Sequence, residues 1–139
     1  MNLGKIYHFT NGKSWSKLNP GNFPIYGSTG IIGTSDTSLC KGNNTLIARV
    51  GMNCGYVQFV DGEYWVTDNT LVATANEDII LPKYGYYLLG TLNLQKYKIG
   101  AAQPLLTIGI LNSLDVNIHS KDIQRHIVNT ISSLLLKSF

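Results

Sequence analysis

The side chains that could carry out chemistry are scattered along this sequence. Its histidines and cysteines stand apart in no recognised metal-ligand motif: His8, His119, His126, Cys40 and Cys54. The acidic residues form two close pairs in expected turns, Asp61/Glu63 and Glu77/Asp78. No Glu-x-Lys follows an upstream Asp, as a metal-dependent nuclease would require. The sequence therefore predicts no catalytic centre, although scattered residues that converge in space could still build one.

Cofactor chemistry lacks a sequence signal as well. There is no Asn/Asp-Pro-Pro-Tyr/Phe motif and no cofactor-binding glycine loop, which argues against a self-contained methyltransferase. The glycines around residues 27–30 do not predict a phosphate site, because no Gly-Lys-Ser/Thr follows and no strong helix begins there. We expect no cofactor and no metal.

Polar and cationic residues on the expected turns suit the recognition of DNA instead. Cations neutralise phosphates, while amide, guanidinium and hydroxyl groups on loops can reach base edges. Asn11 and Thr29 are of these types, and the residues that we expect to contact DNA are Lys13, Lys17, Tyr26, Ser28, Arg49, Asn53, Lys96, Lys98 and Gln103.

Each of these candidates also has a structural interpretation. Lysines ordinarily lie solvated on a protein surface. Tyr26 could belong to the core, and Arg49, in a strand-like run, could equally form an ion pair with Asp68. Trp15 and Trp65 are of a type that more often packs than recognises a ligand.

Composition indicates one folded domain with a single core. The chain has 139 residues, 44% of them hydrophobic and 14% charged, and a net charge of +3 that is a mild signal for a polyanionic partner. Cys40 and Cys54 are expected to be reduced thiols, and a disulfide between them stays open. We expect a cytoplasmic protein without a membrane segment, since no signal peptide and no apolar run of ~20 residues is present.

Strand-like segments occupy the first half of the chain. Residues 3–10 resemble an opening strand that ends at the Asn11-Gly12 turn. Residues 23–33 have the pattern of a tight hairpin. Further strands, separated by glycine-containing turns, are expected at 45–50, 56–60, 63–67 and 70–74. Together these runs predict a twisted, mostly antiparallel sheet.

Helical segments follow. Pro82 is well placed in the first turn of a helix whose face toward the sheet carries Tyr84, Tyr87, Leu88 and Leu92. Thr107 can cap a short helix, and residues 115–118 alternate as a short strand does. Ser120 caps a helix that continues to the end. The predicted fold class is α/β (α+β), with a C-terminal coiled-coil-type helix.

The terminal helix has two interpretations. It carries an apolar stripe of Ile123, Ile127, Ile131 and Leu134, widened by Val128 and Leu135. Packed on its own domain, it would be an ordinary core helix. Projecting from the domain, it would seek a partner helix.

The order of these features resembles the specificity (S) subunit of type I restriction-modification systems. The opening matches at Leu3-Gly4-Lys5-Ile6 and Gly12-Lys13, and the hairpin at Pro24, Tyr26, Gly27, Gly30 and Gly33. The sheet signature is matched by Arg49, Gly51, Gly55, Trp65, Thr67 and Asp68. The closing turn and the run after it are matched by Gly100-Ala101-Ala102-Gln103-Pro104, Leu106-Thr107, Leu111, Leu114, Ile118 and Gln124. Lys5 and Ile123 stand where the family usually has acidic residues.

The resemblance implies a target recognition domain over residues 1–119, followed at 120–139 by the start of a conserved spacer and dimerisation helix. It implies non-catalytic, sequence-specific recognition of one half of a bipartite double-stranded DNA target. Methyltransferase (M) subunits, and indirectly a restriction (R) subunit, would supply the active sites. The stripe would hold M subunits or support self-association. With one recognition domain in place of two, the chain is expected to be a half-subunit, a truncated gene or an excised domain.

Two rival functions stay open. The chain could be an assembly module that binds M subunits without reading DNA, or an enzyme with an unrecognised site. A DNA-binding titration separates the first rival from DNA recognition.

Overall fold

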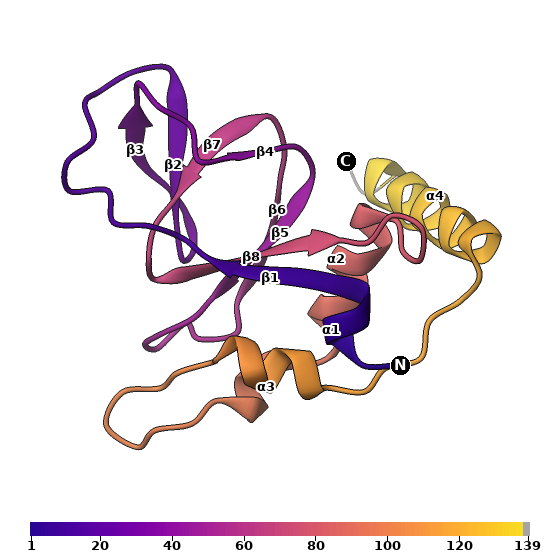
Figure 1. Ribbon diagram of the computed structural model, residues 1–139. Helices are drawn as coiled ribbons and strands as arrows, with labels where there is room; N and C mark the ends of the chain where they lie inside the picture. Colours follow the sequence, from indigo (N-terminus) through magenta and orange to yellow (C-terminus); the bar gives the residue numbers. More distant parts are fainter. Residues whose placement is uncertain (138–139) are drawn as a thin grey trace.

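In the computed structural model, which describes residues 1–137, the strands form two four-stranded sheets. Figure 1 labels the strands and helices. The first sheet is antiparallel, with the order β1 (Tyr7–Asn11), β8 (Thr70–Ala75), β5 (Asn44–Ala48) and β6 (Val57–Val60). The second has the order β3 (Gly30–Ser35), β2 (Phe23–Gly27), β7 (Glu63–Val66) and β4 (Cys40–Lys41). In it β2 and β7 are parallel, and the other neighbours are antiparallel.

The prediction of mostly antiparallel strands is confirmed, but one sheet was expected and two are present. The predicted hairpin is confirmed as β2 and β3. The turns at 61–62 and 67–69 carry the chain from the first sheet to the second and back. Strands that are divided between two sheets give the same sequence pattern as a meander within one sheet. The alternation of side chains determines which residues share a face of a strand, but it does not determine which strands pair.

The helices are short except for α2 and α4. In chain order they are α1 (Leu3–Ile6), α2 (Pro82–Thr91), the 3₁₀ helix η1 (Leu94–Tyr97), α3 (Ile108–Ser113) and α4 (Lys121–Lys137). Pro82 lies in the first turn of α2, as predicted. The predicted cap of α3 is confirmed, because the Thr107 hydroxyl accepts a hydrogen bond from the Ile110 N–H at 3.1 Å.

The two faces of the first sheet support separate cores. Ile47 and Leu71, fully buried, belong to a cluster with residues of α1, α2, η1 and α3. Leu46 and Val72 point to the opposite face and pack with Tyr64 and residues of the second sheet. Successive residues of β5 therefore serve different cores. Each buried Leu or Ile contributes about 1.5–3 kcal/mol relative to an exposed one.

The predicted strand at 3–10 is confirmed only from Tyr7 onward, as β1, and the predicted strand at 115–118 is wrong. Residues 3–6 form the helical turn α1, in which Leu3 and Ile6 are both buried one turn apart. The predicted strand at 115–118 is reduced to one bridge between Asn2 and Asp115, with the Val116 N–H donating to the Met1 carbonyl at 2.9 Å. The two segments contact each other although they are far apart in the sequence. A local sequence pattern therefore could not predict their structure.

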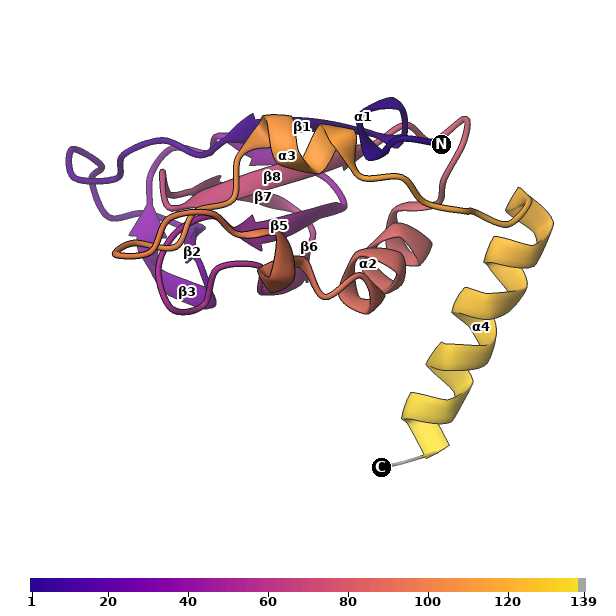
Figure 2. The same ribbon diagram turned by 90° about the horizontal axis from the view of Figure 1, so that it is seen from below.

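Helix α4 leaves the domain on the side opposite β2 and β3 (Figure 2). Its first turns lie near α2, and its C-terminal end points away from the sheets. Ser120 caps it weakly, with 3.5 Å between its Oγ and the Ile123 nitrogen. The last two residues of the predicted helix, 138–139, lie outside the described residues. No helix within residues 1–137 is long and apolar enough to cross a membrane.

The contact between the buried Tyr7 hydroxyl and Gly85 of α2 allows a test of how β1 packs on this helix. The Tyr7 hydroxyl has no hydrogen-bond partner among the described residues, and burial raises its pKa. A Cβ at Gly85 would overlap this oxygen. We expect Gly85→Ala to lower the free energy of unfolding by about 2 kcal/mol through overpacking. We expect Tyr7→Phe to be neutral or to stabilise by about 1 kcal/mol, because it removes an unsatisfied group.

The Tyr7→Phe background should therefore reduce the cost of Gly85→Ala by about 1 kcal/mol in urea unfolding. Strictly additive effects of the two substitutions would show that the hydroxyl does not press on α2.

Candidate nucleic-acid interface

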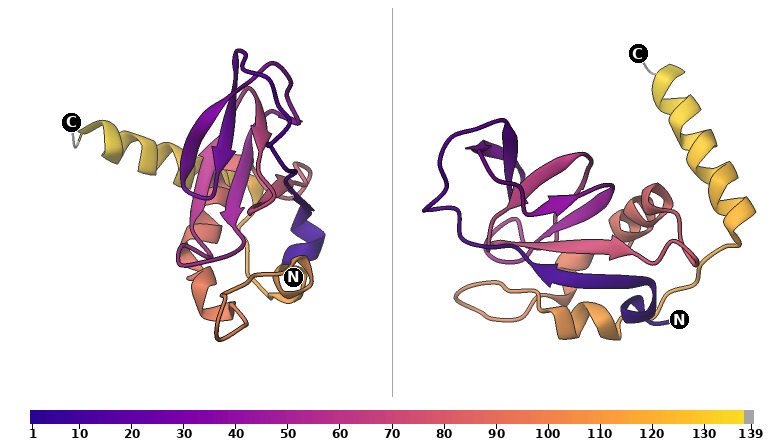
Figure 3. Two further views of the ribbon diagram at one scale, coloured as in Figure 1. Left: turned by 90° about the vertical axis from the view of Figure 1, so that its left-hand side faces the viewer. Right: turned by 45° about the horizontal axis from the view of Figure 1, so that its top comes forward.

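Five loops lie on the side of the molecule away from α4, at the left in Figure 1 and in the right-hand view of Figure 3. They are residues 12–22, 27–30, 49–56, 67–69 and 98–105, and we call them the loop surface. Of the nine predicted DNA contacts, eight lie on these loops or at their edges: Lys13, Lys17, Tyr26, Ser28, Arg49, Asn53, Lys98 and Gln103. Lys96 lies on η1, where its Nζ is 5.1 Å from the centre of the Tyr97 ring.

Backbone hydrogen bonds join the loops at 49–56 and 98–105. The Gly51 N–H donates to the Pro104 carbonyl at 3.0 Å, and the Leu106 N–H donates to the Arg49 carbonyl at 2.8 Å. Loop 98–105 is closed by a pair of 2.9 Å bonds between Ile99 and Leu105. Lys98 and Gln103 are exposed on it. The two loops are thus fixed to one another by their main chains, and their side chains are left at the surface.

Arg49 ties the same region to the turn between β7 and β8. Its Nε donates to the Asp68 carbonyl at 3.1 Å, and its N–H donates to the Asn69 carbonyl at 3.0 Å. The contact with Asp68 is therefore to the backbone, and the described part of the chain shows no ion pair between the two side chains. The half-buried Arg49 keeps part of its guanidinium free for another acceptor.

The β2–β3 turn is anchored by one side chain of a neighbouring strand and by one of its own. Gln58 Nε2 donates to the Gly27 carbonyl at 2.8 Å, and the Ser28 hydroxyl donates to the Asn69 carbonyl at 3.4 Å. Tyr26 is half-buried, with its ring perpendicular to that of Tyr64 at 5.6 Å between centres. Tyr26 thus has the packing role that the sequence left open, and a DNA contact through it stays a prediction.

Loop 12–22 is fixed at its start and exposed along its length. The Lys13 N–H donates to the Val66 carbonyl at 2.9 Å, and the Lys13 carbonyl accepts from Trp65 Nε1 at 3.0 Å. The side chains of Lys13 and Lys17 are exposed, and Trp15 is 45% exposed. Trp65 thus packs and positions a lysine backbone, in keeping with its structural interpretation.

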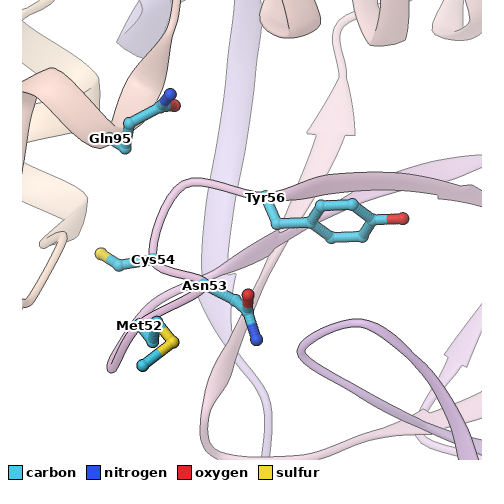
Figure 4. Close-up of a pocket in the computed structure, with 5 residues that line it drawn as sticks. All are labelled: Met52, Asn53, Cys54, Tyr56 and Gln95. Atoms are coloured by element: carbon cyan, nitrogen blue, oxygen red, sulfur yellow. The ribbon is translucent and has the colours of Figure 1, made fainter.

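A pocket of about 240 Å³ lies beside the turn at 51–55 (Figure 4). Figure 4 shows Met52, Asn53 and Cys54 on the turn and Gln95 across from them on η1. Gly55 has φ of +95°, and a Cβ there would lie 2.6 Å from the Gln95 nitrogen, so the close approach of η1 requires glycine. The turn is therefore held against η1 by a contact that other residues would disrupt.

Met52, which sequence reasoning missed, is the most exposed large apolar residue recorded in the described chain, at 96%. Tyr56 beside it is 50% exposed. The sequence did contain a signal for the exposure of Met52, which is an apolar residue between the glycines of a turn. A tight turn does not provide the neighbours that a buried methionine needs.

The two cysteines lie in sites that disfavour the thiolate. Both cysteines are free, and the Cys54 thiol donates to the Arg49 carbonyl at 3.4 Å. Burial raises the pKa of both thiols, which disfavours the nucleophilic thiolate. No group of three or more His, Cys, Asp or Glu that could hold a metal occurs within the described residues.

The predicted stripe on α4 is divided between two environments. Ile127 and Ile131 are half-buried and face α2, with Val128 also packed on the domain. Ile123 is 48% exposed and Leu134 is 59% exposed. Among residues 121–136 of this helix, the one that is fully buried is Gln124. The stripe is therefore partly packed on the domain and partly exposed, because α2 covers part of one side of the helix.

The architecture matches solved structures of type I restriction-modification specificity subunits. An S subunit from Mycoplasma genitalium superposes with a TM-score of 0.82 at 20% identity, covering 96% of this chain and 37% of that one. The HsdS subunit from Thermoanaerobacter tengcongensis superposes with a TM-score of 0.76 at 14% identity, covering 99% of this chain and 37% of that one. The chain thus has the fold of part of such a subunit, equivalent to 37% of its length in both cases.

Sequence comparison then gives the family. Residues 1–138 match the family described as the type I restriction modification DNA specificity domain, and the chain belongs to that family. It is 30% identical over 105 residues to the Escherichia coli type I restriction enzyme EcoprrI specificity subunit, covering 76% of this chain and 26% of that protein. It is 28% identical over 125 residues to a putative type I specificity subunit N-terminus from Mycoplasma pneumoniae, covering 87% and 67%. The chain thus spans about a quarter of the length of the E. coli relative.

Proposed function

We propose that this chain recognises one half of a bipartite double-stranded DNA target, as the recognition domain of a type I specificity subunit. The observation that carries the proposal is the family match over residues 1–138, together with the gathering of the predicted contacts on one loop surface. DNA recognition needs cations for phosphates and polar groups for base edges, and this surface has both. Its loops are fixed by main-chain hydrogen bonds, so that binding costs little loop ordering.

The exposed side chains divide into two chemical roles. Lys13, Lys17 and Lys98 would neutralise phosphates, and Lys96 would extend this contact along η1. Arg49, Asn53, Gln103 and Ser28 offer the donor and acceptor groups that base edges require, with Tyr26 behind them. Met52, at the tip of its turn, would contact an apolar base feature such as a thymine methyl group.

Residues 1–119 would act as the recognition domain and residues 120–139 as the start of the spacer and dimerisation helix. In this assignment the methyltransferase subunits contact α4, and a restriction subunit joins through them. The exposed apolar residues in the last turns of α4, Leu135 at 52% and Leu136 at 78%, support an association role. The chain itself would be non-catalytic, and its partners would carry the active sites.

An assembly module that no longer reads DNA is the second candidate function. The exposed apolar end of α4 favours it, because that feature serves partner binding with or without DNA recognition. DNA binding decides between the two functions, since α4 and the loop surface lie at opposite sides of the molecule.

DNA binding should depend on salt and on the loop lysines. We expect weak binding of duplex DNA by the isolated chain, since the net charge is +3 and one half-site offers few phosphate contacts. Affinity should fall as salt rises, with a log–log slope of about −0.9 per contact. In Lys13→Met/Lys98→Met the slope should become shallower by about 1.8, measured by fluorescence anisotropy.

Lys5→Met is the matched control, because Lys5 is an exposed lysine on α1, away from the loop surface. Binding that is absent at every salt concentration, or equal losses in the control and the loop variant, would contradict a DNA-reading loop surface.

Catalysis should be absent from the isolated chain. With DNA and S-adenosylmethionine, or with DNA, Mg²⁺ and ATP, we expect neither methyl transfer nor cleavage, because the family implies that other subunits carry these reactions. A radiolabelled methyl assay with an unrelated methyltransferase as positive control measures this. Methyl transfer that follows the chain through successive columns would favour an enzyme instead.

The last turns of α4 should support association. We expect Leu135→Asp/Leu136→Asp to weaken self-association or binding of methyltransferase subunits by at least about tenfold, because it places charges in an apolar contact. Sedimentation measures the mass, and circular dichroism checks the fold. Ser133→Asp adds a charge at an exposed polar position of the same turn and serves as control. Equal association of wild type and both variants would argue against this surface.

A further inference from the structure

A buried amide lies in an otherwise largely exposed helix. Gln124 has 0% exposure, whereas its neighbours Ile123, Arg125 and His126 on α4 are exposed. Burying a glutamine amide is costly unless its polar atoms are paired. The apolar Ile123, one residue earlier, stays 48% exposed, and the polar Gln124 is buried in its place.

The Gln124 amide is bonded to backbone groups of two other segments. Its Oε1 accepts from the Leu81 N–H at 2.8 Å. Its Nε2 donates to the Ile79 carbonyl at 3.0 Å and to the His119 carbonyl at 2.8 Å. Both N–H groups of the amide are used, and the oxygen is paired. These bonds connect α4 to the start of α2 and to the linker at 117–119.

The linker has a second fixed point beside the first. His119 Nδ1 lies 2.8 Å from the Tyr84 hydroxyl, with the two rings nearly perpendicular. Tyr84 is a buried residue of α2 and belongs to the main core. Gln124 is therefore connected to the main core in two ways. It bonds directly to the backbone of residues 79 and 81, and it bonds to His119, which contacts Tyr84.

The apolar contact between α4 and the domain is incompletely filled. A cavity of about 250 Å³ lies between α2 and α4, lined among others by Tyr87, Leu88, Ile127 and Ile131. Beyond Ile131 the exposed Leu135 and Leu136 show that the domain no longer covers the helix. An incompletely filled apolar contact permits sliding and tilting, whereas hydrogen bonds with directional donors and acceptors do not.

We propose that Gln124 is the positioning residue that sets the direction of α4 relative to the two sheets. Its three bonds act at the root of the helix, so that a small change there moves the far end by a large distance, as the projection of α4 in Figure 3 illustrates. Resting on the proposed function, Gln124 would also fix where the loop surface stands relative to subunits bound along α4.

The direction of α4 can be measured in the whole chain by amide residual dipolar couplings. Gln124→Met preserves side-chain length and removes every amide hydrogen bond. We expect the couplings of the strands to fit one alignment tensor, as in the wild type, and those of α4 to deviate from it or shrink. The Leu81 amide, which loses its acceptor, should exchange with solvent about tenfold faster. Gln95→Met makes the same change at an exposed glutamine on η1 and should alter neither result.

Each outcome of this experiment bears on the proposal. Couplings of α4 that still fit the wild-type tensor in Gln124→Met would overturn it. Gln124→Glu is the second variant, since it retains the acceptor for Leu81 and loses both donors, and the same displacement of α4 is expected. If both variants lose the strand resonances, Gln124 is required for folding and the positioning role is wrong.

DNA affinity gives an independent readout. We expect it to stay within about twofold of wild type in Gln124→Met, because the loop surface is remote from the joint. If neither protein binds DNA, the proposed function fails while the couplings still decide the role of Gln124.

Discussion

The pairing of β5 with β8 is the interaction on which the rest of the structure depends. All five residues of β5 are buried, and the strand lies between β8 and β6 in the first sheet. Because side chains alternate, Ile47 and Leu71 face the helices while Leu46 and Val72 face the second sheet. Neither core could be buried if this strand pair slipped by one residue, since every side chain would then change faces. The two cores are therefore aligned by a single register.

The same strands deliver the loop surface. β5 ends at Ala48, and the next residue, Arg49, bonds to the turn between β7 and β8 and to the segment that follows loop 98–105. Loops that are far apart in the sequence thus meet at one end of a rigid sheet pair. Exposed side chains on such loops can be substituted without disturbing either core, which suits the recognition role proposed for the loop surface.

Helix α4 is attached on a different physical principle. The domain is held by apolar burial, but the root of α4 is held by a buried amide and a cavity-containing contact with α2. Hydrophobic contact stabilises without fixing direction, whereas paired hydrogen bonds fix direction because an unpaired buried group is costly. Recognition and assembly, as proposed, are thereby placed at opposite sides of one domain and joined by a directional link.

The sequence by itself determined the elements that depend on local rules: the β2–β3 hairpin from its glycines, the proline start of α2, and the Thr107 cap of α3. It also indicated the family, since motif order is a property of the chain. Only the tertiary structure decided that the strands form two sheets and that residues 3–6 are helical. It alone turned Gln124 inward in place of Ile123 and placed Met52 at a tip. The physical reason is that strand partners and the burial of one helix face depend on contacts between distant residues, which local propensity does not encode.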